Sequence, residues 1–560
     1  MKNTVILLAA LLGWIGLQGC ARTDQSATSA MEGIVRSQDE GAMEGVLVSA
    51  RKSGSKMEIT VVSDSQGRYR FPADRLVPGS YALSTWAAGY GSADKSGIEV
   101  TPNKSTQADL DLQKLQDKTK FGMQLSHTEW AMTLGSQKIF RCGECHVLGR
   151  PMSKTYEPSQ WEQVIVRMEN YNHSSGIRRG GIFIVPRWYP EHKLDDGDRE
   201  FAKYLNSVAG PDHLARTELK TLPRPKGDGT KVILTSYDLA LDDSAPHDVA
   251  VGDDGSIWHS EIALPYVGKF DPRTGEDKLY KLPEDTWGFP YVGTQEIQTD
   301  PEGNLWFGVQ VGNTIGKVDK NTGALTMYPM AEGGPVSYPL QQGEVNFRTS
   351  SIAVSGDGMV WTLDTGSNSR KHVHRLNPQT RKVDHFPIPD KDKHSLAGLT
   401  ADSKGNSYFG GLGGNTFGKV DGATGKVTYY PPPTADSGPR RMKPDGKDRI
   451  WFAEFRGNKV AMFDPATEQI KEWPIPSTFA GPFDVAPDKN GDIVWICGNY
   501  DDHIYKLDAR TGRIVTYALP RPFGNLQSLS VDHTAKAPTV WVGEDTHGKI
   551  TKIEVLDDAN

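Results

Sequence analysis

Short runs in which apolar and polar residues alternate make up most of this chain, and turn residues separate them. Such alternation predicts β-strands with one buried face. It is clear over Val46–Ala50 and Met57–Val61, and it returns from residue 231 to the end of the chain. Between these parts, residues 113–212 follow a helical period instead. The pattern therefore predicts a mainly β protein of several domains with a small helical domain in the middle.

Three helices are predicted in the middle segment. The first covers Ala131–Phe140 and the last covers Asp196–Val208. The second begins at Ser159, which forms a capping box with Glu162 three residues later. Its apolar residues fall at positions i, i+3, i+4 and i+7 and share one face: Trp161, Val164, Ile165 and Met168.

The C-terminal part repeats. Each unit carries one aromatic residue in a Gly-x-(Ile/Leu)-Trp pattern or a variant of it: Trp258, Trp306, Trp361, Tyr408, Trp451, Trp495 and Trp541. Evenly spaced strands with one aromatic signature per unit predict a β-propeller, and seven units predict seven blades. The last unit ends near Val555, so we expect Lys231–Leu239 to supply the strand that closes the ring.

The pattern Cys-x-x-Cys-His, formed by Cys142, Cys145 and His146, predicts a covalently bound c-type haem. Each thiol adds to one haem vinyl group, and the adjacent histidine is then held under the ring as an iron ligand. A zinc site needs a second pair of ligands, and the remaining cysteines are the distant Cys20 and Cys497. A redox dithiol is typical of a βαβ setting, which the sequence does not indicate. We therefore expect one haem c.

The sixth iron ligand is left open by the sequence, because sulfur and imidazole both serve in this position. The candidates are Met168, Met152, His173 and His192. The loop before the last predicted helix contains both histidines and no methionine. The segment Arg167–Tyr171 resembles an Arg-Met-x-x-Tyr segment of propeller-linked cytochrome domains, which favours Met168. An iron without a sixth ligand, open to oxygen or peroxide, is the remaining alternative.

Polar and charged residues recur just before the first strand of most propeller units. The strongest candidates are His247, Glu296, Arg348 and Arg441. Residues in this position face the central channel of a propeller, so we expect these four to converge at its mouth. Such a set would bind an anionic or polar ligand, with His247 or Glu296 placed for proton transfer. The alternative is a water-filled channel that is polar without binding a ligand.

Three family resemblances follow from these motifs. The turn and strand Gly67–Phe71 and the strand Leu76–Tyr81 resemble the carboxypeptidase regulatory-like (transthyretin-like) β-sandwich, a module that is usually passive. The helical segment with its Cys-x-x-Cys-His motif resembles a small class I cytochrome c domain. The segments Asn304–Gly308 and Ile450–Val460 resemble the virginiamycin B lyase (streptogramin lyase) propellers.

The lyase resemblance implies magnesium-dependent elimination, because that family uses a histidine and glutamates around the metal. Its Glu-x-His arrangement does not align with this chain. His259 and Glu261 have the right residue types in reversed order. Mg²⁺ is therefore expected only if the protein is a lyase.

The predicted fold class is multidomain and mainly β, with a transthyretin-like sandwich, a small helical class I cytochrome c domain and a seven-bladed propeller. The predicted boundaries are a lipoprotein signal peptide over 1–20, a tether over 21–30, the sandwich over 31–112, the cytochrome domain over 113–212, a linker over 213–230 and the propeller over 231–560.

The N-terminus predicts export and lipid attachment. Lys2 precedes the mostly apolar Val5–Leu17, and Leu17-Gln18-Gly19-Cys20 resembles a lipobox in which Cys20 is lipidated. This places the protein in a bacterial cell envelope, anchored on the periplasmic side of a membrane, which we expect to be the outer membrane. Haem attachment of this type is completed outside the cytoplasm, so the two signals agree.

Composition and charge limit the classes of binding partner that the sequence indicates. The 560 residues include 63 basic and 70 acidic residues, so the formal charge is 63 − 70 = −7, which indicates no nucleic-acid partner. We expect an envelope-located haem protein in electron transfer or oxidation, with a haem c-dependent oxidoreductase as its enzyme class. Its propeller is expected to bind a redox partner protein or a small polar or anionic substrate. The alternatives are a lyase or hydrolase with a structural or sensory haem, and a docking module that passes electrons to a dehydrogenase or oxidase.

Overall fold

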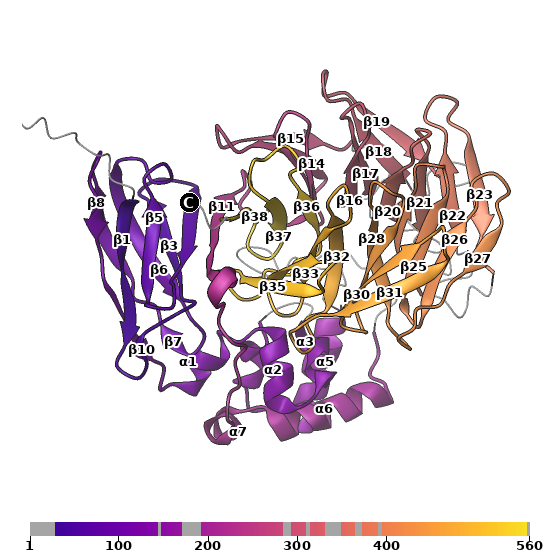
Figure 1. Ribbon diagram of the computed structural model, residues 1–560. Helices are drawn as coiled ribbons and strands as arrows, with labels where there is room; N and C mark the ends of the chain where they lie inside the picture. The colour runs from indigo at the N-terminus through magenta and orange to yellow at the C-terminus, as the bar shows by residue number, and fades with distance from the viewer. Residues whose placement is uncertain are drawn as a thin grey trace, which may run out of the picture.

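The computed structural model describes residues 29–143, 147–170, 192–283, 293–309, 314–330, 349–364, 372–389 and 395–556. Within these residues the chain forms a β-sandwich, a helical unit and a β-propeller, which lie against one another (Figure 1). The predicted fold class, mainly β and multidomain, is confirmed at this level. The described helices are few and are confined almost entirely to the segment between the two β structures.

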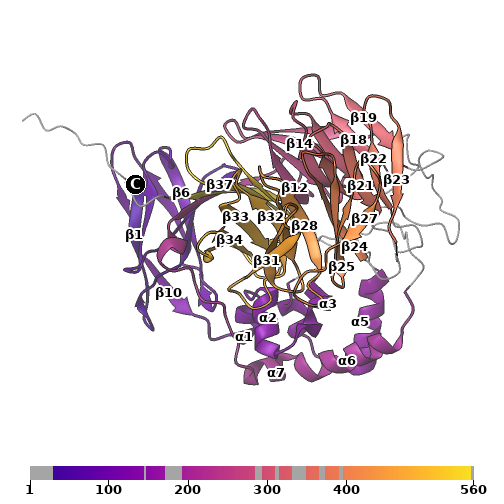
Figure 2. The same cartoon turned by 45° about the vertical axis from the view of Figure 1, so that its right-hand side comes forward.

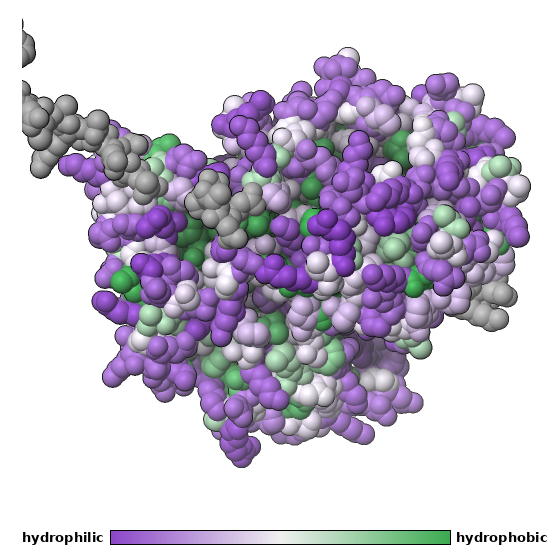
Figure 3. Space-filling model, in the orientation of Figure 1, coloured by the Kyte–Doolittle hydropathy of each residue, from purple (hydrophilic) through white to green (hydrophobic). Residues whose placement is uncertain are grey.

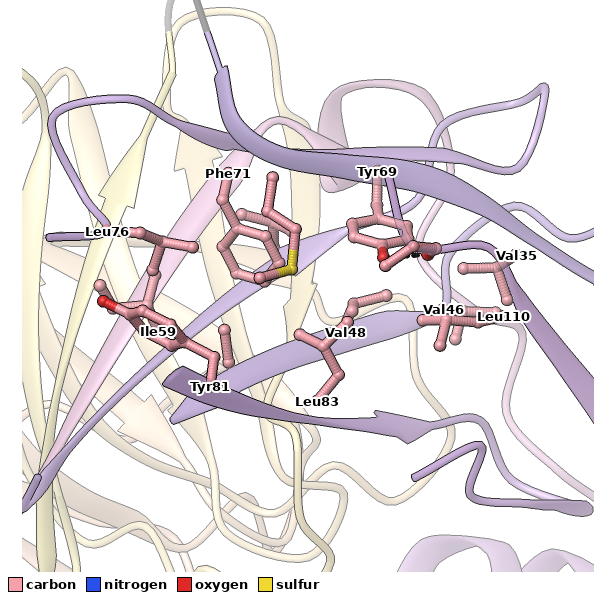
Figure 4. Packing of buried hydrophobic residues seen from close by; sticks show 14 of the residues in the cluster. Val35, Val46, Val48, Ile59, Tyr69, Phe71, Leu76, Tyr81, Leu83 and Leu110 are labelled. Carbon is pink, nitrogen blue, oxygen red and sulfur yellow. Dashed lines mark hydrogen bonds between the residues drawn. The ribbon is translucent and has the colours of Figure 1, made fainter. Parts of the chain in front are cut away.

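The sandwich consists of two sheets built from the first ten strands. These are β1 (Ser29–Ser37), β2 (Gly41–Ala42), β3 (Leu47–Lys52), β4 (Met57–Val62), β5 (Arg68–Pro72), β6 (Gly79–Trp86), β7 (Tyr90–Gly91), β8 (Lys95–Val100), β9 (Thr106–Gln107) and β10 (Leu110–Lys114). One sheet has the order β2-β1-β10-β7, and the other contains β4-β3-β6-β8. Alternate side chains of both sheets fill the core between them, where Tyr69 and Phe71 from β5 meet Val48 from β3 (Figure 4).

The helical unit, residues 118–216, has seven short α-helices in its described residues. These are α1 (Lys118–Gly122), α2 (His127–Leu134), α3 (Phe140–Gly143), α4 (Gly149–Met152), α5 (Pro158–Asn170), α6 (Asp196–Val208) and α7 (Pro211–Arg216). Its apolar core includes Trp130, Trp161, Ile165 and Leu205. The core is separate from those of the sandwich and the propeller, so the unit packs around its own centre.

Two of the predicted helix boundaries were wrong. The helix expected over Ala131–Phe140 is broken, because Gly135 ends α2 in the left-handed conformation at φ 62°. A 3₁₀ turn over Gln137–Ile139 then leads into α3. The second helix begins at Pro158 and not after a Ser159 cap, since proline suits a first helical position that needs no N–H partner. The predicted last helix has the expected bounds, but α7 follows it.

Seven four-stranded blades form the propeller in the described residues. In chain order they are β12–β15 (Pro246–Val251, Ile257–Glu261, Tyr266–Asp271, Glu276–Lys281), β16–β19 (Thr294–Thr299, Leu305–Val309, Thr314–Val318, Leu325–Pro329), β20–β23 (Thr349–Val354, Val360–Asp364, His372–Leu376, Val383–Pro387), β24–β27 (Ser395–Ala401, Ser407–Gly413, Thr416–Val420, Val427–Tyr429), β28–β31 (Pro439–Pro444, Ile450–Glu454, Lys459–Asp464, Gln469–Pro474), β32–β35 (Pro482–Pro487, Ile493–Gly498, His503–Asp508, Arg513–Ala518) and β36–β38 (Leu529–Val531, Thr539–Glu544, Lys549–Val555) with β11 (Val232–Asp238).

The first strand of each blade contacts the first strands of both neighbouring blades, and β36 contacts β12, so the ring is closed. The strand that closes the last blade is β11, which pairs with β38 from Val232–Val555 to Asp238–Lys549. This confirms the prediction that Lys231–Leu239 supplies the strand that closes the ring. Closure by an N-terminal strand ties the two ends of the propeller together and leaves no unpaired edge inside the ring.

The repeated sequence motif has a packing reason. The signature aromatic lies on the second strand of each blade and is buried. In three blades the third strand carries a Gly-Lys pair, and its glycine lies opposite the residue that follows the aromatic, as Gly316 lies opposite Phe307. A Cβ on Gly316 would lie 2.0 Å from the Phe307 ring, so only glycine allows that ring to cross the neighbouring strand. The lysine of the same Gly-Lys pair covers the aromatic, as Lys317 lies over the Trp306 ring at 5.3 Å.

The sandwich and the propeller share one sheet. The second edge of β11 pairs with β4 from Ile233–Val61 to Tyr237–Met57, giving an eight-stranded sheet in the order β36-β37-β38-β11-β4-β3-β6-β8. The sandwich is therefore fixed to the last blade by backbone hydrogen bonds (Figure 2). The exposed face of the molecule is mostly hydrophilic, with apolar residues in small groups (Figure 3). Among the described residues, no helix has the length and apolarity needed to cross a membrane.

Candidate functional site

Cys142 lies near the end of α3 and lines an open-sided pocket of about 820 Å³, a volume that counts the space at its mouth. The pocket lies between α3, α5 and α6, and its walls are largely apolar, with contributions from Trp161, Ile165 and Phe201. Met168 also lines it. The structure therefore places the first predicted attachment cysteine and the favoured axial methionine on one pocket. Cys145 and His146 lie outside the described residues.

The other axial candidates are placed differently. Met152 is buried at 1% exposure and does not line the pocket. The Nε2 atom of His192 lies 2.7 Å from Asp198 Oδ2, so this imidazole would have to leave a carboxylate to reach iron. His173 lies outside the described residues. Of the four candidates, Met168 is the one that lines the pocket in the described part of the chain.

Charges at the pocket rim suit a haem, which is an apolar disc with two carboxylate groups. Arg150, Lys154 and Arg167 line the pocket, and none of them forms an ion pair with another described residue. The Nε1–H of Trp161 is buried at the pocket and has no acceptor among the described residues. A buried donor without a partner is costly and is expected to find one in the bound group. These residues therefore fit a haem with its carboxylates toward the basic rim.

A buried ion cluster supports the pocket wall. Asp198 caps α6 together with Asp195, and its carboxylate accepts a 2.5 Å hydrogen bond from Arg141 Nη2. Burial would raise the pKa of Asp198, but the Asp195 N–H and Arg141 together hold it below its ordinary value. Arg141 also lies 5.2 Å over the Phe201 ring. The residue before Cys142 is thus tied to α6, which keeps α3 in position.

In the propeller, two of the predicted mouth residues are brought together from opposite parts of the ring. The guanidinium of Arg441, on β28, binds both carboxylate oxygens of Asp248, on β12, at 2.6 and 2.8 Å. The Nδ1 atom of His247 lies 2.5 Å from Asp248 Oδ1. All three side chains are almost completely buried. Burial lowers the pKa of His247, whereas the Asp248 charge outweighs burial and raises that of Arg441.

Glu296, on β16, has a different environment. Its Oε2 atom is buried without a hydrogen-bond partner among the described residues. Burial is the main reason that its pKa is raised to about 7, although Arg441 acts in the opposite direction. A carboxyl with this pKa exchanges protons near neutral pH, as acid–base chemistry requires. The fourth predicted mouth residue, Arg348, lies outside the described residues.

A bulge at the start of the inner strands explains why these side chains enter the channel. The pairing register shifts between Pro246 and Val249 in β12, between Thr294 and Ile297 in β16, and between Pro439 and Met442 in β28. An extra residue in a strand redirects the side chains around it. The predicted mouth residues His247, Glu296 and Arg441 all fall within these shifts.

His259 and Glu261 lie on β13, within the first blade, and both are completely buried. The Nε2 atom of His259 lies 2.9 Å from Asp277 and its Nδ1 atom lies 3.1 Å from Glu261. Burial opposes the charge on His259, but Asp277 and Glu261 together raise its pKa to about 10. This cluster is a closed ion network inside the blade and does not offer ligands to the channel.

The helical unit packs on the face of the propeller where the inner strands begin, which sequence analysis did not predict. Thr128 donates through its N–H to the Tyr500 carbonyl at 3.1 Å and through its hydroxyl to the Phe479 carbonyl at 2.8 Å. The Phe140 and Tyr500 rings lie 4.3 Å apart. Phe479 lies three residues before the inner strand β32. The helices α2, α3 and α5 lie below the propeller in both views (Figures 1 and 2).

A small cavity marks the junction of the sandwich, the helical unit and the propeller. Its lining includes Trp86, Glu129, Asp502 and His503. The carboxylate of Asp502 accepts hydrogen bonds from the N–H groups of Phe523 and Gly524, each at 2.7 Å. Burial nevertheless raises the pKa of Asp502 to about 7, with a further contribution from Asp501 and an opposing one from His503.

We expect Asp502 to weaken the fold as pH rises from about 4 to 7. In this window the folded protein keeps a proton that the unfolded chain has lost, so the free energy of unfolding falls, by up to about 1.4 kcal/mol per pH unit for one group. Asp502→Asn should remove this part of the slope in urea unfolding at pH 5 and pH 7. Asp243→Asn, on an exposed loop, is the control. Equal slopes for wild type and Asp502→Asn would contradict the assignment.

Two family models match parts of the chain. Residues 337–559 match the virginiamycin B lyase family, and residues 30–113 match the carboxypeptidase regulatory-like domain. The propeller is virginiamycin B lyase-like. The sandwich is carboxypeptidase regulatory-like. A search among curated proteins finds no match.

One solved structure supports the propeller fold, and two others are similar to the chain at a lower level. A streptogramin B lyase structure is 21% identical with a TM-score of 0.50 and covers 59% of this chain and 100% of its own. Virginiamycin B lyase from Staphylococcus aureus is 21% identical with a TM-score of 0.49, covering 58% of this chain and 100% of its own. A catalytically inactive variant of that lyase with quinupristin is 20% identical with a TM-score of 0.48 and the same coverage. At this level of identity the likeness concerns the fold alone.

Proposed function

We propose that this protein is a c-type haem protein that works in electron transfer or oxidation in the cell envelope, with the propeller binding a substrate or a redox partner protein. The pocket beside Cys142 carries the proposal. It joins apolar walls, a thiol, a thioether, a buried indole donor and a basic rim in one place. Each feature matches one part of a haem.

In this proposal Cys142 and Cys145 hold the haem, and His146 and Met168 are its iron ligands. When bound, the haem supplies one-electron oxidation and reduction. Trp161 and the basic rim hold its carboxylates, and the apolar walls exclude water. The packing of α2 and α3 on Tyr500 and Phe479 keeps this pocket beside the channel mouth. A lipid on Cys20 would tether the protein to the periplasmic side of a membrane, as the sequence predicts.

The test is a visible spectrum of the protein matured in cells that attach haem c, taken oxidised and reduced and titrated for its potential. A reduced haem c spectrum that stays with the protein after denaturation is expected. Protein that matures in such cells, folds and carries no covalent haem would rule the proposal out.

Met168→Leu is expected to remove the sulfur–iron charge-transfer band, lower the potential and allow carbon monoxide to bind the reduced iron, because leucine keeps the volume but has no ligand atom. Met152→Leu, in the buried core of the same unit, is the matched control and should keep the wild-type spectrum. An unchanged spectrum in Met168→Leu would exclude Met168 as the ligand and leave the two histidines as candidates.

A lyase is the second candidate, favoured by the family match of the propeller. It would use the channel mouth with Mg²⁺, and the haem would then be structural or sensory. Magnesium-dependent opening of a cyclic ester such as quinupristin, retained by folded Cys142→Ala protein, would support this candidate. A complete lack of turnover in the wild type with and without Mg²⁺ would remove it.

A further inference from the structure

Arg440, on β28, is a cation without an anion. Its Nε atom is buried and has no acceptor, and no carboxylate lies within ion-pair distance among the described residues. Its guanidinium instead lies between two rings, 3.6 Å from the centre of Phe483 and 5.2 Å from that of Phe455. The residue is partly buried, and of its guanidinium nitrogens only Nε is fully buried without an acceptor.

The neighbouring charges are already paired. Arg441 is held by Asp248, and Lys443 lies 2.7 Å from Asp484. Glu296 interacts electrostatically with Arg440, but the two residues form no ion pair. Burial and the adjacent Arg441 lower the pKa of Arg440 to about 9, so at neutral pH the residue keeps a charge that its surroundings disfavour. A charge that is largely removed from water and has no counter-charge is expensive, which indicates that a bound group completes this environment.

Another arginine in the propeller shows what a completed site looks like. Arg375, on β22, also lies over two rings, 5.4 Å from Trp361 and 5.5 Å from Phe386. Its guanidinium, however, is neutralised by Asp384 at 2.8 Å and bonded to the Gly422 carbonyl at 2.6 Å. Both arginines lie over two aromatic rings. Arg375 has a carboxylate partner, whereas Arg440 has none among the described residues.

We propose that Arg440 anchors a binding site for a small monocarboxylate with a short apolar body. The planar fork of a guanidinium matches both oxygens of a carboxylate. Phe455 and Phe483 offer apolar surface beside the fork, which favours an apolar tail over a fully hydrated inorganic anion. This inference does not rest on a bound haem.

The site lies between the channel and the helical unit. The Phe455 ring lies 5.1 Å from that of Tyr500, which in turn contacts Phe140, two residues before Cys142. A ligand on Arg440 would therefore sit beside the residues that join the two parts. This position suits a substrate or effector of a redox centre in the helical unit.

Calorimetric titration of the full-length protein with benzoate, butyrate and inorganic phosphate tests the site. Benzoate and butyrate are expected to bind, phosphate is not, and Arg440→Gln should weaken carboxylate binding at least about tenfold, a change equivalent to about 1.4 kcal/mol. Arg440→Lys keeps the charge without the fork and should bind with intermediate affinity. Arg375→Gln is the matched control and should bind as the wild type does.

Thermal unfolding gives a second readout that does not depend on knowing the natural ligand. Benzoate should raise the melting temperature of wild type and leave that of Arg440→Gln unchanged. Without ligand, Arg440→Gln should be at least as stable as wild type, because it removes an uncompensated charge. Equal carboxylate binding in wild type and Arg440→Gln, no binding to wild type, or tighter binding of phosphate would overturn the proposal. A missing haem spectrum would leave these results unaffected and would bear only on the proposed redox function.

Discussion

Replacing Cys142 by alanine is expected to remove one of the two thioether bonds, and replacing Cys142 and Cys145 together should leave no covalently bound haem. The physical reason is that each thioether bond needs its own thiol. The other groups that line the pocket can hold a haem only without a covalent bond to it. Haem staining after denaturing electrophoresis measures the covalent fraction. The double variant should lose the signal completely.

Cys497→Ala is the matched control for this prediction. Cys497 is buried on β33, and burial raises the pKa of its thiol to about 12, so it is an unreactive core residue. Its replacement should leave the haem signal at the wild-type level. A double variant that still carried covalent haem would show that other residues attach it and would remove the motif from the proposed function.

Loss of Arg521 is expected to cause the largest fall in stability among single changes away from the haem pocket. Arg521 binds Glu58 of the sandwich at 2.6 Å and Glu544 of the last blade at 3.2 Å, and Glu544 is completely buried. Burial would raise the pKa of Glu544, but Arg521 and His547 hold it well below its ordinary value. Arg521→Met should leave Glu544 without its main counter-charge and lower the free energy of unfolding by about 3 kcal/mol.

Urea unfolding at pH 7 measures this change. Arg513→Gln is the control, because Arg513 is 64% exposed and pairs with an exposed Asp228, so its loss should have no measurable effect. A stability of Arg521→Met equal to that of wild type would show that the sheet shared by β4 and β11 holds the sandwich without this ion pair.

Local patterns predicted much of the fold. Alternation with a period of two identified strands such as β4. The spacing of the aromatic residues predicted seven blades, because each blade buries one aromatic residue on its second strand. The Cys-x-x-Cys-His motif predicted a cofactor from thiol and imidazole chemistry alone. Helix ends were less predictable, since Gly135 ends a helix only when the backbone around it turns into the left-handed region.

The candidate sites were predicted in part. The polar residues before the inner strands were recognised as mouth residues, but not that Asp248 and Arg441, 193 positions apart, would neutralise each other. His259 and Glu261 occur in the reverse of the order that the lyase family uses, which made them doubtful metal ligands. The structure buries both side chains within a blade. Arg440 was one of several charged residues in the sequence, and only its lack of a partner distinguishes it.

What the sequence determined by itself is local: strand periods, the repeating unit and the closing strand of the ring. Tertiary structure alone decided that β11 joins two domains through both its edges, that the helical unit packs on the channel side, and which charges are paired. The reason is that alternation tells which face of a strand is buried but not which distant strand lies beside it. Pairing of buried charges depends on that arrangement, since a counter-charge acts only where the fold brings it within a few ångströms.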